Sequence, residues 1–221
     1  MSTQSSFADR IEAGYKADGH CTWGFVIYRT TYDNDADWDE FMRRLRIWTA
    51  AEMDMFNGQD VLDHMTWTIF DDRETFDNAD TSTIRTHFRE RCESALRSEQ
   101  CPLAPMGRSP RYRYCVQVDG DALKSSVHYA PPPLKFDHDK QGWVKVIKKD
   151  WLPRSEDPIF AGRKPDPEVY EPIEGCTERH VGWMRWSSSS AMTEYYMLFQ
   201  DLNQYVISYR RPPKVIGYPW K

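Results

Sequence analysis

Two similar stretches of sequence, "TWGFVIYRTTYDN" at residues 22–34 and "TWTIFDDRETFDN" at residues 66–78, decide the fold. Each contains a run of apolar, aromatic and β-branched residues, which is typical of a buried strand. Each is followed by a helical pattern, so the sequence predicts two strand–helix units in succession. The two stretches agree at six of 13 positions, and the likeness fades after Asn34 and Asn78. Similar strand ends explain this identity, while a true duplication, as in a tandem ferredoxin-like pair, remains the alternative.

The segments that follow the two strands predict long amphipathic helices. In the first, from about residue 37 to 54, Asp37 and Glu40 are spaced like a capping box. In the second, Thr81 or Ser82 can cap the helix. Both helices place apolar side chains on one face at helical spacing, namely Trp38, Phe41, Leu45 and Trp48 in the first and Ile84, Phe88, Cys92 and Ala95 in the second.

The rest of the chain adds further strands and one more helix. "RYRYCVQVDGD" at 111–121 alternates apolar and polar residues, which predicts a strand with one solvent-exposed face. "GWVKVIKKDW" and "VGWMRWS" read as strands, the Ser187–Ser190 run as a helix cap, and 205–209 as an edge strand. We therefore expect an α+β fold with a mixed or antiparallel sheet of five or six strands and helices mainly on one face.

The domain organisation follows from Pro- and Gly-rich stretches. We expect a flexible segment at 1–20, a single domain at 21–210 and a basic tail at 211–221. Long surface loops are expected within the domain near 98–110, 126–141 and 151–179.

Composition and charge narrow the function. The net charge is −5, without a basic stripe, so we expect no nucleic-acid partner. Residues 1–80 hold 17 acidic and seven basic residues, whereas 81–221 hold 17 and 22. This split indicates either solvated surface charge or a homo-oligomer. No apolar run reaches the ~20 residues that a membrane helix needs. Five cysteines without a CxxC pair, and a start unlike a signal peptide, indicate a cytoplasmic protein.

A set of segments resembles a known group of proteins. These are "WGFVIYRTTYDNDADWDEFMRRLR", "TSTIRTHF", "RYRYCVQVD", "WVKVIKKDW" and "GWMRWSSSSAMTEYYML", which in this order span about residues 22–202. In order and aromatic positions they resemble a widespread group of uncharacterised proteins of filamentous fungi. The resemblance implies a cytosolic α+β domain with variable Pro-rich loops, and it implies no catalytic residue.

Polar side chains at the strand ends suggest one candidate site. Arg29 and Arg73 occupy matching positions in the two similar stretches, and Asp71 and Asp72 precede the second arginine. With His180 they could clamp a small anionic or aromatic metabolite and supply a general acid. An ion pair on the surface explains the same residues. A cofactor-independent enzyme that uses Arg29, Asp71, Arg73 and His180 is therefore the alternative function.

Other reactive residues have simpler explanations. "DHD" at 137–139 and "CTERH" at 176–180 contain metal-ligating residue types, but they lack the paired spacing of a zinc site. The chain has neither a GxSxG elbow nor a P-loop, so the serine run is interpreted as capping. We predict neither a metal nor a cofactor.

The aromatic residues give the main functional prediction. Five tryptophans lie on expected strands, namely Trp23, Trp67, Trp143, Trp183 and Trp186. Most strand tryptophans are core residues, but any that face a cavity would suit a flat apolar ligand or a protein partner. The sequence therefore favours a binding or interaction module with an aromatic-lined surface for a small molecule or a protein.

Overall fold

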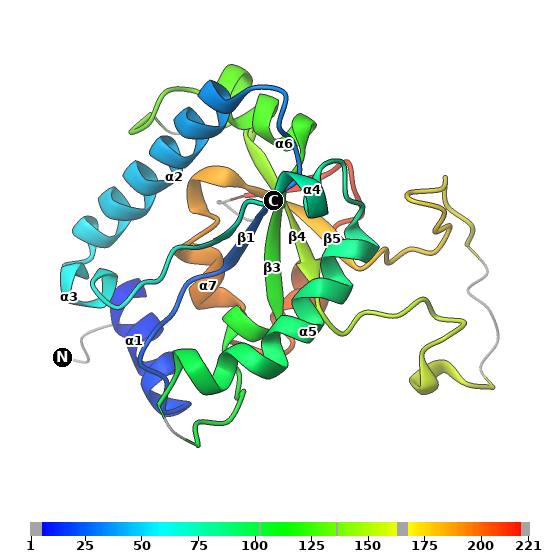
Figure 1. Ribbon diagram of the computed structural model, residues 1–221, viewed down its shortest axis with the longest axis horizontal. Helices are drawn as coiled ribbons and strands as arrows, with labels where there is room; N and C mark the ends of the chain where they lie inside the picture. The colour runs from blue at the N-terminus through cyan, green and yellow to red at the C-terminus, as the bar shows by residue number, and fades with distance from the viewer. Residues whose placement is uncertain (1–5, 102, 136, 163–167, 218–221) are drawn as a thin grey trace.

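The protein is built on one mixed sheet of six strands, as the computed structural model shows (Figure 1). The structure describes residues 6–101, 103–135, 137–162 and 168–217. The strand order is β2-β1-β3-β4-β5-β6. The strands are β1 (Val26–Arg29), β2 (Thr68–Phe70), β3 (Tyr114–Val118), β4 (Trp143–Lys148), β5 (Trp183–Ser187) and β6 (Val215–Ile216).

The strand pairs are parallel at both sides of this sheet and antiparallel in its middle. β1 pairs in parallel with both β2 and β3, β4 runs antiparallel to β3 and β5, and β6 runs parallel to β5. The carboxyl ends of β1, β2 and β3 therefore lie at one edge of the sheet. The mixed six-stranded α+β architecture expected from the sequence is confirmed.

Helices cover both faces of the sheet, with more of them on one face. The buried side chains of α1, α2, α3, α6, α7 and α8 share a core with one set of strand residues, and those of α4 and α5 share a smaller core with the alternate set. The bounds are α1 (Phe7–Ala17), α2 (Asp35–Met55), α3 (Gln59–Leu62), α4 (Arg73–Phe76), α5 (Thr81–Glu99), α6 (Gly120–Lys124), α7 (Glu194–Leu198) and α8 (Gln204–Ser208). Short 3₁₀ turns lie at η1 (Pro110–Tyr112), η3 (Pro158–Phe160) and η4 (Ser188–Ser190), and a π turn lies at η2 (Ser125–Tyr129).

The two long helices form where the sequence predicts them, with different caps. Asn34 caps α2 because its side chain accepts a hydrogen bond from the backbone N–H of Asp37. Asp80 caps α5 in the same way through Thr83, in place of the expected Thr81 or Ser82. In both cases a short polar side chain before the expected cap, by three positions in α2 and by one or two in α5, has the extended backbone that an N-cap requires.

Two expectations about strands are wrong. All five residues of β3 are buried, because α5 covers the face that the alternating pattern suggested was wet. Residues 205–209 contribute to the helix α8, and the edge strand next to β5 is β6, which lies in the segment expected to be a basic tail. Its backbone pairs with Arg185 and Trp186 of β5.

The N-terminal region also differs from expectation. The segment 1–20, predicted to be flexible, contains α1, which begins with a capping box between Ser6 and Asp9. Ile11 and Tyr15 of α1 are buried in the main core. This helix contributes one wall of the pocket described below.

The two similar stretches lie on neighbouring parallel strands but are not structurally equivalent. The sheet pairs Val26 with Thr68, an offset of 42 residues, whereas the sequence match has an offset of 44. Arg29 therefore ends β1, while Arg73 begins the helix α4. This displacement fits similar local sequences better than a duplicated unit.

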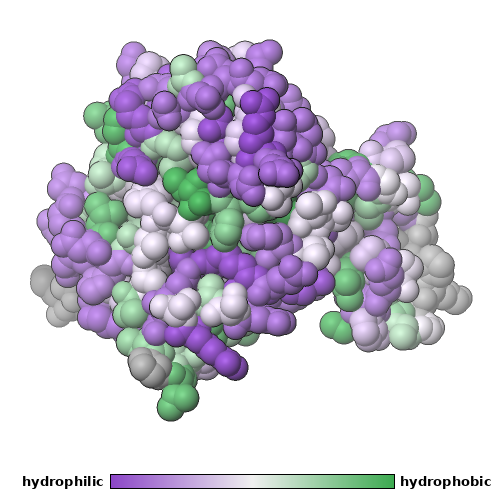
Figure 2. All heavy atoms as spheres, in the orientation of Figure 1, coloured by the Kyte–Doolittle hydropathy of each residue, from purple (hydrophilic) through white to green (hydrophobic). Residues whose placement is uncertain are grey.

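The helices differ from membrane-spanning helices in the part of the chain that the structure describes. None of the helices there is at once long enough and apolar enough to cross a lipid bilayer. The face seen in Figure 2 is mainly hydrophilic, with small separate hydrophobic patches.

Candidate functional site

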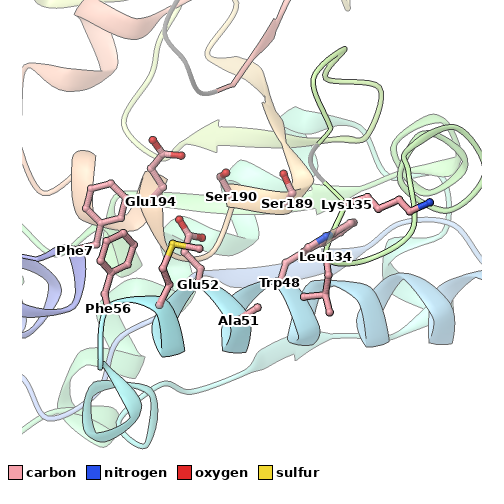
Figure 3. Close-up of a pocket in the computed structure, with 11 residues that line it drawn as sticks. Phe7, Trp48, Ala51, Glu52, Phe56, Leu134, Lys135, Ser189, Ser190 and Glu194 are labelled. Carbon is pink, nitrogen blue, oxygen red and sulfur yellow. The ribbon is translucent and has the colours of Figure 1, made fainter.

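A pocket of about 440 Å³ lies between α1, α2, the turn η4 and the start of α7 (Figure 3). Its walls combine aromatic and aliphatic side chains with two carboxyl groups. The lining residues are Phe7, Trp48, Ala51, Glu52, Met55, Phe56, Leu134, Lys135, Ser189, Ser190 and Glu194.

The helix α2 forms one side of this pocket. Trp48, Ala51, Glu52 and Met55 occupy positions i, i+3, i+4 and i+7, so they project from one face of the helix. The turn η4 lies beside α2, because β5 ends at Ser187 and the chain then passes over this helix. The geometry of the sheet therefore brings the serine run and α2 together.

Two glutamates from different elements meet at the pocket. Glu52 accepts a hydrogen bond from the hydroxyl of Thr193, next to Glu194. Burial raises the pKa of the Glu52 carboxyl to about 7; the Thr193 hydrogen bond opposes this effect, and the neighbouring charge of Glu194 adds to it. Burial also raises the pKa of the Glu194 carboxyl, against the opposing hydrogen bond from Ser190. Near pH 7 the Glu52 carboxyl is therefore close to its pKa and is partly protonated.

Neither carboxylate has a cationic partner in the described part of the chain. The salt bridges there involve other residues, although Lys135 lines the pocket. Figure 3 shows the Lys135 ammonium group directed away from Glu52 and Glu194. Glu194 is only 4% exposed, so its charge is poorly solvated.

Aromatic rings bound the pocket at two ends. Phe7 of α1 and Phe56, just after α2, pack with ring centroids 4.7 Å apart. At the other end lies the indole of Trp48, which is 7% exposed. The buried Nε1 of Trp48 has no hydrogen-bond partner among the described residues.

The structure brings together three of the residues predicted for catalysis. Arg29 is buried, and its guanidinium contacts Asp35 and Asp71, with Arg29 Nη1 3.4 Å from Asp71 Oδ2. Its Nε donates to the carbonyl of Thr31 at 2.9 Å. Arg73 lies nearby, over the same Tyr32 ring as Arg29. All three guanidinium nitrogens of Arg29 donate to protein groups, so this side chain links the strand ends to the start of α2.

The fourth residue, His180, lies at the other end of the sheet. It precedes β5 by three residues, and the start of β5 pairs with the end of β4, which pairs with the start of β3. Arg29 pairs instead with Val118 at the end of β3. His180 stacks on Tyr209 at 3.9 Å, and burial, with nearby cations, lowers its pKa to about 4. The predicted convergence of Arg29, Asp71, Arg73 and His180 in one catalytic pocket is therefore wrong.

The strand tryptophans lie mainly in the core. Trp23, Trp143, Trp183 and Trp186 are at most 8% exposed, and Trp67 is partly buried against the main core. None of the five lines the pocket of Figure 3. An aromatic-lined pocket exists, but its rings belong to helices and to the residue after α2, because the six strands are covered on both faces.

The two candidate metal motifs are engaged in local structure. Both oxygens of Asp137 accept backbone hydrogen bonds, from Gln141 and Gly142. Both oxygens of Glu178 accept from the backbone of Arg154. Within the described ranges, no three His, Cys, Asp or Glu side chains form a group that could hold a metal ion.

Comparisons with protein-family models, with curated proteins and with solved structures find no match to this chain. The functional argument therefore rests on the geometry of the pocket.

Sequence reasoning missed most of this pocket. Ser189 and Ser190 were interpreted as helix caps, but α7 begins later, after Thr193, and the two serines face the pocket instead. Glu52 is not among the site residues that the sequence predicts. Its position four residues after Trp48, on the apolar face, is the signal that marks it as unusual.

Proposed function

We propose that the protein binds a small molecule with an apolar body in the pocket between α1, α2 and α7. One observation carries the proposal: an apolar, aromatic-ended pocket contains two poorly solvated carboxyl groups from separate elements. Ligand sites in proteins usually combine apolar walls with a few polar groups that orient the ligand. The pocket volume lies within the range of about 300–1,000 Å³ that is typical of such sites.

The free-energy cost of burying Glu52 and Glu194 favours a ligand-binding role for these residues over a purely structural one. A carboxyl group without a cation in an apolar wall opposes folding, because its charged form loses hydration. Residues selected for stability alone would fill this space with aliphatic side chains. Retaining Glu52 and Glu194 beside Trp48 is consistent with a binding function.

The cytoplasm is the compartment that we propose for this function. The five cysteines are free thiols, with Cys92 and Cys115 buried. Free cysteines of this number are typical of proteins in a reducing environment. The suggested relation to fungal proteins, a possible protein partner and a homo-oligomeric state remain proposals from the sequence.

Blocking the pocket tests the proposed function. A set of neutral, cationic and anionic aromatic fragments can be screened for binding by ligand-detected NMR. We expect some fragments to bind the unmodified protein. Ala51→Trp should abolish their binding, because Ala51 lines the pocket. The matched control is Ala50→Trp, one position along the same helix on its exposed face. It should retain the binders.

Two results would contradict the proposal. One is a set of binders that is the same for Ala51→Trp as for the unmodified protein. The other is the absence of any binder from the unmodified protein. Circular dichroism of both variants would show that α2 is retained.

A further inference from the structure

We propose that the ligand of this pocket is an organic cation, a protonated amine on an aromatic or aliphatic body, whose charged group is received between Glu52 and Glu194. This inference rests on the proposed function, because it specifies the ligand class of the same pocket.

The two carboxylates of the pocket favour a cationic ligand. Glu52 from α2 and Glu194 from α7 approach from different elements, and no described cation forms a salt bridge with either. An ammonium group donates three hydrogen bonds and carries the missing positive charge. Charge-assisted hydrogen bonds of this kind are stronger than neutral ones. An anionic ligand would instead place a further negative charge beside these two carboxyl groups.

The aromatic walls of the pocket independently favour a cationic ligand. Trp48 lies at one end of the pocket, and Phe7 and Phe56 lie at the other. Aromatic faces attract organic cations, with Trp the strongest of the three ring types. The pocket thus offers acceptors for a cation and rings for its apolar body.

The pH dependence of ligand binding is determined by Glu52 and the ionisable groups around it. These groups are Glu194 and Tyr195 of α7 and Lys135 of the bordering loop. The pKa of Glu52 is raised to about 7, mainly by burial, so this group takes up a proton below that pH in the free protein. The ammonium of an alkylamine remains charged throughout this range, with a pKa near ~10. Binding of an amine should therefore be strong above pH 7 and weaken as the pH falls below it.

Three compounds of one shape test the inference by isothermal titration calorimetry. Naphthylethylamine, naphthylethanol and naphthylpropionate differ in charge but share the apolar body. At pH 8 we expect the amine to bind at least about tenfold more tightly than the alcohol, and the acid to bind most weakly. Lowering the pH to 6 should weaken the amine and leave the alcohol unchanged.

Substitutions at the carboxyl pair complete the test. Glu52→Gln keeps an acceptor for Thr193 and should lower the affinity for the amine about tenfold, with little effect on the alcohol. Glu194→Gln is the second variant and should act in the same direction. Asp39→Asn is the matched control, because it makes the same change in net charge on an exposed part of α2.

The outcomes separate the two proposals. If the alcohol or the acid binds as tightly as the amine, or if both glutamine variants keep the full affinity for the amine, the cation inference is overturned while the binding function stands. If none of the three compounds binds and the fragment screen also fails, the proposed function is overturned, and the inference with it.

Discussion

At the scale of single residues, identical letters in two similar stretches have different roles. Arg29 ends a buried strand, and its side chain is 6% exposed between two carboxylates and a carbonyl. Arg73 begins a short helix with its side chain 67% exposed. The difference arises from the two-residue offset between the sequence match and the strand register. Burial, rather than residue type, determines which arginine matters to the fold.

The two arginines provide a matched prediction. Arg29→Ala should lower the free energy of unfolding by about 1–3 kcal/mol, mainly because it leaves the carbonyl of the buried Thr31 without its donor. Arg73→Ala should change it by less than about 0.5 kcal/mol, since its ion pair with Asp77 is exposed. Urea unfolding followed by circular dichroism measures both. Similar effects of the two substitutions would contradict the assigned roles.

At the scale of elements, the pocket exists because α1 and α2 are held together by close packing. Gly58 follows α2, and a Cβ atom at this position would lie 2.6 Å from the Cβ of Ala8 in α1. It would also lie 2.7 Å from Cε of Met53. The missing side chain at Gly58 therefore allows α1 to approach and to place Phe7 against Phe56.

The close approach of Ala8 and Gly58 can be tested with one substitution that disrupts it and a second that restores space. Gly58→Ala should lower the free energy of unfolding by about 1–3 kcal/mol, because the rigid Cβ of Ala8 cannot move without shifting α1. Adding Ala8→Gly removes one of the two colliding atoms, so part of the loss should be recovered beyond the sum of the single effects. A double-mutant cycle of urea unfolding measures this coupling.

Zero coupling between Ala8 and Gly58 would show that α1 does not pack on the end of α2 as described. Glycine in a helix lowers the free energy of unfolding by about 1 kcal/mol relative to alanine. The single variant Ala8→Gly measures this effect, and the double-mutant cycle subtracts it.

At the scale of the whole molecule, the sequence predicts the sheet well and the pocket poorly. The apolar runs at β1, β4 and β5 and the helical periodicities of α2 and α5 are local signals, and these elements form as predicted. Local patterns do not show what covers a strand, so β3 was expected to have a wet face. They also do not show that the serine run after β5 passes over α2. The site depends on such contacts between distant segments, and for that reason the strand tryptophans were predicted in place of Trp48.

We expect the pocket beside Trp48, rather than a surface formed by the strand tryptophans, to receive the ligand. The most direct measurement is a ¹H–¹⁵N spectrum of the indole N–H groups of the nine tryptophans during a titration with naphthylethylamine. Trp48→Phe assigns one signal. We predict that the Trp48 signal shifts most, because its ring lines the pocket, while the signals of Trp23 and Trp186 in the core stay in place. A titration that moves the Trp23 or Trp186 signal and leaves that of Trp48 unchanged would contradict the account.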